Sequence, residues 1–260
     1  MIDCHCHLDS EIFNNDLDLV IARAKKVGVK YIIAPAVDYQ SFAKILKIAQ
    51  KYKFVLPLLG YHPHNIYNLS FSEFEVFFKN LLENNKNNII GIGEVGLDYF
   101  YDKSIKKKQL QFLELQLHNA EVYKLPVQLH IRESFRDCFD LVKKYNILPI
   151  WHSFNGSYLE AKKFLDRNGY ISLSGMITFQ KLNKLIEIIK KIPVEKILLE
   201  TDSPFLTPEP LRGRRNEPSY VKIIYEFVTE ILNLDSNYLQ QQINNNFLEI
   251  FKNQLNKTKK

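Results

Sequence analysis

The chain begins with Met1-Ile2-Asp3-Cys4-His5-Cys6-His7-Leu8, a short run of alternating residue types. Side chains of a β-strand point alternately to its two faces, so this run predicts a strand with His5 and His7 on one face and Cys4 and Cys6 on the other. Two neutral imidazoles in this arrangement can bind one ion of Zn, Mn, Fe or Co. One alternative is a pair of partly buried histidines without an ion. A thiolate site is a weaker alternative, because the cysteines face away from the histidines.

Apolar runs and helical patterns alternate along the rest of the chain. Seven short apolar runs follow, each preceded by a segment whose apolar residues recur at helical spacing. The expected strands lie at 31–34, 54–59, 89–94, 126–130, 148–152, 170–174 and 196–202. The expected helices lie at 13–27, 39–52, 71–83, 105–124, 134–145, 157–167, 181–191 and near 218–233, with two short helices after them.

Eight strands separated by helices predict an α/β protein with a parallel sheet. Closure into a (β/α)8 TIM barrel is favoured, because the 260 residues match the size of a single barrel, about 250 residues. An open doubly wound sheet is the alternative, and the lack of a glycine-rich phosphate loop after the first strand weakens it. We expect one barrel domain over residues 1–254 and a disordered basic tail over 255–260.

Composition limits the class of protein. A hydrophobic content of 46% is ample for a large core and excludes a disordered chain. The net charge of +6 permits a polyanionic partner without requiring one. Three cysteines are too few for a disulfide framework, and the sequence has neither a run of 18 apolar residues nor a basic-then-apolar leader. We therefore expect a cytoplasmic protein without a membrane span, with a monomer favoured.

Ionisable side chains gather where the expected strands end, which in a TIM barrel is the end that carries the active site. They are His5, His7, Glu94, His130, His152 and Asp202. Each of them alone could be structural. Together, four imidazoles and two carboxylates exceed the three protein ligands of a tetrahedral catalytic site. The set therefore predicts two divalent cations, about 3.5–4 Å apart, that share a carboxylate.

A second layer of polar residues is expected beneath these candidates. Asp3, Gln128 and Glu200 each lie two residues before a candidate ligand, so they point inward one layer deeper. There they could accept or direct the distal N–H of the ligand histidines. A lone polar residue solvated by a buried water is an equally good alternative.

Seven motifs, in order along nearly the whole chain, resemble those of the TatD-type metal-dependent deoxyribonucleases of the amidohydrolase superfamily. The motifs are Asp3-Cys4-His5-Cys6-His7-Leu8, Gly60-Tyr61-His62-Pro63, Gly93-Glu94-Val95-Gly96-Leu97-Asp98-Tyr99, Pro126-Val127-Gln128-Leu129-His130-Ile131-Arg132, His152-Ser153-Phe154, Glu200-Thr201-Asp202-Ser203-Pro204-Phe205-Leu206 and Arg212-Gly213-Arg214-Arg215-Asn216-Glu217-Pro218. The resemblance implies a hydrolase of phosphodiester bonds in DNA, acting as a 3′-5′ exonuclease on single-stranded ends. It implies two divalent ions, of Mg, Mn or Zn, as cofactors and nucleic acid as the partner.

We hypothesise separate roles for the candidate ligands. Many amidohydrolases bridge their metals with a modified lysine on the fourth strand, and Glu94 takes that place here. One cation would be held by His5, His7 and Asp202, and the other with the help of His130 and His152. Glu94 and Asp202 are then the catalytic residues, with Asp202 as the general base.

Residues beyond the strand ends are candidates for substrate binding. His62 and Arg132 could bind the phosphate, although His62 could instead stabilise a loop. The last loop carries arginines that could follow a nucleic-acid backbone or form salt bridges within the loop, namely Arg212, Arg214 and Arg215. Aromatic residues near the mouth could stack on unpaired bases or pack within loops, namely Tyr61, Tyr99, Phe100 and Tyr101.

Two other functions stay open. The same ligands could hydrolyse an ester or amide, as in a D-aminoacyl-tRNA deacylase, or a small lactone. A small closed pocket would favour these reactions, whereas an open charged groove would favour the nuclease. A non-catalytic binding module would show no change in any activity when His130 is replaced by alanine.

Overall fold

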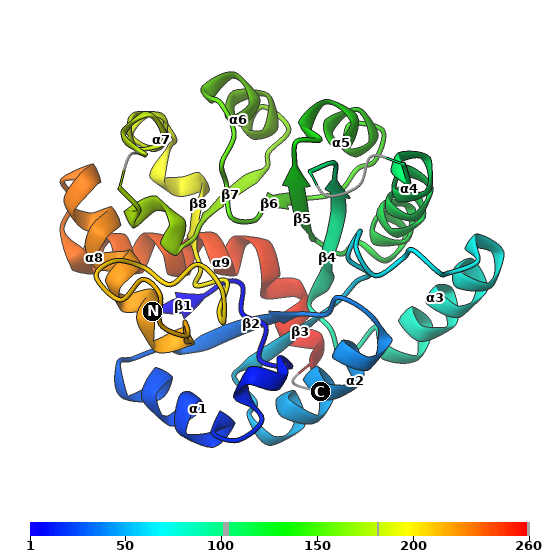
Figure 1. Cartoon of the computed structure of the whole chain (residues 1–260), viewed down its shortest axis with the longest axis horizontal. Coiled ribbons are helices and arrows are strands. Elements are labelled where there is room, and N and C mark those ends of the chain that lie inside the picture. Colours follow the sequence, from blue (N-terminus) through cyan, green and yellow to red (C-terminus); the bar gives the residue numbers. More distant parts are fainter. Residues whose placement is uncertain (101–103, 181, 259–260) are drawn as a thin grey trace.

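The computed structural model describes residues 1–100, 104–180 and 182–258. Eight parallel strands follow one another around a single sheet in sequence order (Figure 1). They are β1 (Ile2–Asp3), β2 (Tyr31–Pro35), β3 (Val55–Leu59), β4 (Gly91–Asp98), β5 (Val127–Arg132), β6 (Pro149–Trp151), β7 (Tyr170–Leu173) and β8 (Ile197–Leu199). The last strand returns to the first, because Cys4 N–H donates to Leu199 O and a parallel bridge joins Cys6 to Ser203. The predicted TIM barrel is confirmed.

Helices form the outer layer of the barrel (Figure 1). They are α1 (Leu17–Lys26), α2 (Tyr39–Lys51), α3 (Phe71–Asn85), α4 (Lys106–Tyr123), α5 (Phe135–Val142), α6 (Tyr158–Leu165), α7 (Asn183–Ile189), α8 (Val221–Leu232) and α9 (Ser236–Thr258). Short 3-10 turns lie at η1 (Glu11–Phe13), η2 (Gly175–Thr178), η3 (Val194–Lys196) and η4 (Pro218–Tyr220). Within the described ranges, no helix combines the length and apolar character needed to cross a membrane.

The final helix differs from the prediction. A single α9 replaces the two short helices expected at the end of the chain. It also continues through residues 255–258, where a disordered tail was expected to begin, because Leu255 is buried against the barrel. Residues 259–260 lie outside the described part of the chain.

Helix α9 covers the N-terminal end of the barrel, and in Figure 1 it passes across the ring of strands. Its buried residues Phe247, Phe251 and Leu255 share one hydrophobic cluster with side chains from six strands, namely Ile2, Ile33, Leu56, Leu58, Ile150, Tyr170 and Leu198. Asn246 fixes the helix by donating to the Ile197 carbonyl at 2.7 Å. This end is therefore apolar and filled, which leaves the opposite end for polar chemistry.

The opening segment is less regular than a long strand. Only Ile2–Asp3 has strand geometry, and the chain then runs between its two neighbours. Cys6 N–H donates to the carbonyl of Ile33 in β2, and His7 N–H donates to the carbonyl of Ser203, which follows β8. Cys4 and Cys6 are buried. The segment keeps its place because it bonds to β2 on one side and to the chain after β8 on the other.

Candidate metal centre

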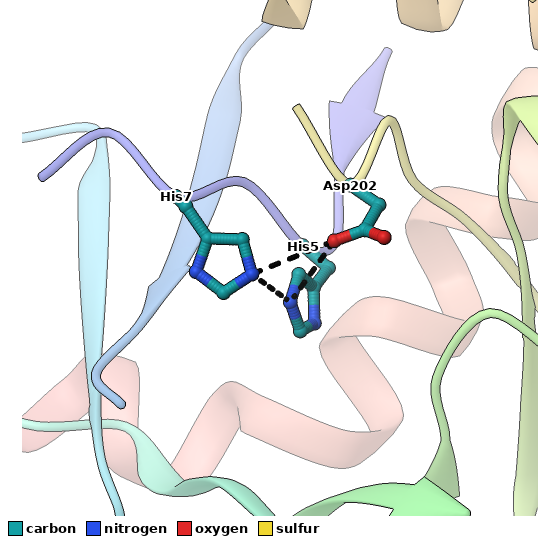
Figure 2. A group of neighbouring side chains, drawn as sticks. All are labelled: His5, His7 and Asp202. Carbon is teal, nitrogen blue, oxygen red and sulfur yellow. Dashed lines mark hydrogen bonds and ion pairs between the residues drawn. The ribbon is translucent and has the colours of Figure 1, made fainter. Parts of the chain in front are cut away.

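The side chains of His5 and His7, which follow β1, and of Asp202, which follows β8, converge at the C-terminal end of the barrel (Figure 2). His5 Nε2 and His7 Nε2 are 3.1 Å apart. Asp202 Oδ1 lies 3.6 Å from the first nitrogen and 3.5 Å from the second. The backbone fixes this convergence, because Asp202 N–H donates to the His5 carbonyl at 2.9 Å.

Glu94 joins this group to a second one. Its Oε2 lies 3.5 Å from His5 Nε2 and 3.6 Å from His7 Nε2. Its Oε1 lies 2.8 Å from His130 Nδ1 and 3.0 Å from His152 Nε2. Each carboxylate oxygen of Glu94 therefore faces a different pair of imidazoles.

The spacing of the first group fits a divalent cation. Ligand atoms about 2.1 Å from a tetrahedral ion are about 3.4 Å apart. His5 Nε2 and His7 Nε2 are 3.1 Å apart, and each of them lies 3.5 to 3.6 Å from Asp202 Oδ1 and from Glu94 Oε2. Neutral imidazole and carboxylate are also the donors that such ions take. Around Glu94 Oε1 the distances are those of hydrogen bonds, so these imidazoles and Glu94 also satisfy one another.

The backbone of β4 is shaped to present Glu94. The register between β4 and β5 shifts between Ile92 and Val95, and such an irregularity re-aims a side chain. Glu94 N–H donates to the Ala36 carbonyl beyond β2. At Gly96, with φ of 153°, an added Cβ would lie 1.9 Å from the His130 carbonyl oxygen. Only glycine lets the two strands approach this closely, which brings Glu94 and His130 together.

The predicted second layer is present in part. Glu200 lies 3.1 Å from His152 Nδ1 and accepts from Ser153 N–H at 2.7 Å, so it orients that imidazole as expected. For Asp3 the prediction is wrong, because its carboxylate accepts from the Thr201 backbone and hydroxyl.

Gln128 also departs from the prediction, because its amide N–H donates to the Cys4 carbonyl at 2.8 Å. Among the described residues, its Oε1 and the Nδ1 of His5 are buried without a hydrogen-bond partner. Asp3 Oδ1 also accepts from the His5 backbone N–H at 3.4 Å, so Asp3 and Gln128 both bond to the backbone around His5.

Sequence reasoning missed Asp98. This residue is buried at the end of β4, four positions after Glu94, and its Oδ2 lies 3.2 Å from His130 Nε2 and 2.9 Å from His64 Nε2. His130 is therefore held between two carboxylates. The even spacing from Glu94 at a strand end was the signal that could have identified Asp98.

The carboxylates and imidazoles of the centre shift one another's pKa values. Burial alone would raise the pKa of Glu94, but the imidazoles of His152, His62 and His130 hold it well below its usual value. Burial lowers the pKa of His62 well below its usual range, so this ring is neutral. Burial would also lower the pKa of His152, but Glu94 and Glu200 raise it well above normal. The neighbouring imidazoles therefore keep the Glu94 carboxylate ionised.

A cavity of about 490 Å³ lies over this centre, and its lining includes His62 and Arg132. Their role in substrate binding stays a prediction. The two sides of the cavity differ in character. His62, His64 and Arg132 come from the ends of β3 and β5, whereas Met176, Phe205 and Leu206 come from the chain after β7 and β8. The guanidinium of Arg132 lies 4.0 Å from the ring centre of Phe100.

The aromatic residues predicted near the mouth have different surroundings. Tyr61 is buried and packs edge-on against Phe74 at 4.8 Å, so it belongs to the core. Tyr99 is buried too, and its hydroxyl donates to Asp137. Phe100 is 53% exposed. Tyr101 lies outside the described residues. Of the three described aromatics, only Phe100 is exposed, and the Arg132 guanidinium lies over its ring.

Ion pairs account for part of the arginine-rich loop. Arg215 donates to both carboxylate oxygens of Asp16, each at 2.7 Å. Arg23 of α1 pairs with Glu217 of the same loop at 2.7 Å. Arg212 lies over the Phe179 ring at 4.1 Å. Packing and loop anchoring therefore explain Arg212 and Arg215, and Arg214 is exposed.

Comparisons with known proteins agree with this geometry. A family model described as TatD related DNase matches residues 2–252. The chain is 36% identical over 234 residues to the uncharacterized metal-dependent hydrolase YabD of Bacillus subtilis (strain 168), covering 89% of this chain and 91% of that protein. It is 30% identical over 263 residues to deoxyribonuclease TATDN3 of Homo sapiens, covering 96% of this chain and 94% of that protein.

Solved structures give the same result. The structure of YjjV, a TatD homolog from Escherichia coli K12, matches with a TM-score of 0.92 at 30% identity, covering 97% of this chain and 98% of that chain. A mutant organophosphorus hydrolase matches with a TM-score of 0.65 at 11% identity, which shows a shared fold alone.

Proposed function

The chain belongs to the TatD-related DNase family of metal-dependent hydrolases, and on that premise we propose that it hydrolyses phosphodiester bonds in DNA at a two-metal site. We further propose that it acts as a 3′-5′ exonuclease on single-stranded ends. The observation that carries the proposal is the position of Glu94, whose two oxygens face His5 and His7 on one side and His130 and His152 on the other.

One ion would be held by His5, His7 and Asp202. The other would be held by His130 and His152, and Glu94 would contribute to both sites. Divalent ions so placed supply an activated water at neutral pH and neutralise charge that develops on the phosphate oxygens. Asp202 accepts the proton of the attacking water. Burial would raise the pKa of Asp202, but its hydrogen bond to His7 and the nearby His152 keep it below the usual value, so it is ionised and ready to accept.

His62 and Arg132 would bind the substrate phosphate. Arg132 offers a planar fork of N–H donors that matches two phosphate oxygens. His62 lies 3.6 Å from Glu94 and lines the same cavity, so its ring can donate one hydrogen bond to a phosphate oxygen. The basic side of the cavity therefore orients the phosphate over Glu94.

The proposal is tested with single-stranded DNA labelled at either end, a matched duplex, and buffers that contain Mg²⁺, Mn²⁺, Zn²⁺ or EDTA. We expect shortening from the 3′ end that requires a divalent ion and is faster on the single strand. Glu94→Gln should abolish it, whereas Glu226→Gln on the exposed face of α8 should not. Intact DNA in every ion, together with hydrolysis of a D-aminoacyl-tRNA or a lactone, would refute the nuclease and support the alternative.

A further inference from the structure

The cavity has an apolar side that phosphate chemistry does not use. Met176 on η2, together with Phe205 and Leu206 after β8, forms this side, which we call the apolar wall. The wall adjoins the metal centre, because the Phe205 ring lies edge-on to His7 with a centroid distance of 5.9 Å. When a phosphodiester is bound over Glu94, the nucleoside next to it therefore lies within reach of the apolar wall.

Phe205 stands out from the wall into solvent. Its side chain is 56% exposed, although it follows closely on the buried Asp202 and Ser203. Its backbone is fixed on both sides, because its N–H donates to the Asp202 carbonyl and its own carbonyl accepts from Asn216. A fixed backbone thus presents a large exposed aromatic face beside a polar centre.

We propose that the apolar wall binds an unpaired nucleobase, which stacks on Phe205 while the adjoining phosphate lies over Glu94. This inference rests on the proposed function and adds a determinant of specificity to it. Every base has a π-face, so such stacking tolerates any sequence. A base within a duplex is already paired and stacked and must first be extruded, so the wall favours single-stranded ends.

The test compares two single-stranded oligonucleotides that differ only at the end the protein cleaves. One ends in a normal nucleotide, and the other ends in a tetrahydrofuran residue that lacks the base. We expect Phe205→Ala to lower kcat/KM for the first substrate about tenfold, which corresponds to about 1.4 kcal/mol, and to leave the second unchanged. Phe205→Trp should keep the preference for the base. Tyr238→Ala, at a 45% exposed residue of α9, serves as the control.

Equal losses on both substrates would overturn the inference, because Phe205 would then act only by packing against His7. Wild-type protein that cleaves both substrates equally well would overturn it too, and would leave the nuclease proposal intact. Wild-type protein that cleaves neither substrate in any divalent ion would refute the nuclease proposal together with the inference.

Base stacking can also be measured without cleavage. An oligonucleotide with 2-aminopurine at its terminal position is titrated with protein in EDTA. We expect saturating wild-type protein and Phe205→Trp to lower its emission by stacking, and Phe205→Ala to lower it much less. The same quenching by Phe205→Ala and wild-type protein would place the base elsewhere and overturn the inference.

Discussion

Asp98 Oδ2 lies 3.2 Å from Nε2 of His130, and the other ring nitrogen of His130 is 2.8 Å from Glu94. A carboxylate on the distal nitrogen fixes the tautomer and direction of a metal-binding imidazole and increases its basicity. Asp98 is therefore expected to act through His130.

Replacement of Asp98 by asparagine tests this role. We expect Asp98→Asn to lower the affinity for divalent ions about 10- to 100-fold, because the imidazole loses its charged partner. The affinity is measured by competition with a fluorescent chelator. Asp140→Asn, at a half-exposed residue of α5 that pairs with Lys143, should leave the affinity unchanged. An unchanged affinity in Asp98→Asn would contradict this role and would leave only the contact with His64 as the function of Asp98.

Divalent ions should stabilise the fold. An ion that binds only the native state at 100 times its Kd raises the free energy of unfolding by about 2.7 kcal/mol. Urea titrations with and without the ion measure this gain, and EDTA should remove it. His7→Ala should lose most of the gain, whereas His118→Ala, on the exposed side of α4, should keep it. The same gain in His7→Ala and wild-type protein would place the ion away from His7.

Gly96 is expected to tolerate no side chain. Gly96→Ala places a Cβ 1.9 Å from the His130 carbonyl oxygen, so β4 and β5 must move apart. We expect a loss of at least about 2 kcal/mol in unfolding free energy, together with weaker ion binding. Gly213→Ala is the matched control, because Gly213 also has a positive φ, of 89°, but an added Cβ meets no atom within 4 Å. Gly213→Ala should lower the free energy of unfolding by only about 1 kcal/mol.

Asp16 should contribute to acid stability. The hydrogen bonds from Arg215 and Arg23 hold its pKa at about 2, below the value of about 3.9 in an unfolded chain. Its ionised form therefore stabilises the fold above about pH 4, and this contribution is lost as the pH falls from about 4 to about 2. Asp16→Asn should flatten the pH dependence of stability in this window, as measured by urea unfolding. Asp166→Asn, at an exposed residue paired with Lys162, is the control and should leave the pH dependence of stability unchanged.

The barrel and the convergence of its ligands could be predicted because both depend on periodicity. Strand–helix alternation set the topology, and the position of His5, Glu94, His152 and Asp202 at strand ends placed them on one rim. The bulge in β4 could not be predicted, because it depends on how closely two strands approach at Gly96. Asp98 was missed for a related reason, since its partners come from β5 and from the loop after β3.

Helix α9 shows the limit of local propensity. The run Asn244-Asn245-Asn246 has poor intrinsic helix propensity, which favours a break between two short helices. Packing overrides this preference, because Phe247 and Phe251 on one side of the helix are buried at the end of the barrel. Contacts distant in sequence therefore decided the length of the helix. The hydrogen bonds that link Asp3 and Gln128 to distant backbone groups could not be predicted for the same reason, because these partners are far away in the sequence.

Helix α9 closes the N-terminal end of the barrel, and side chains fill the barrel interior. Under the proposed function, a DNA strand therefore binds, and its product leaves, at the C-terminal end that carries Glu94. Product release must then precede the binding of the next strand end.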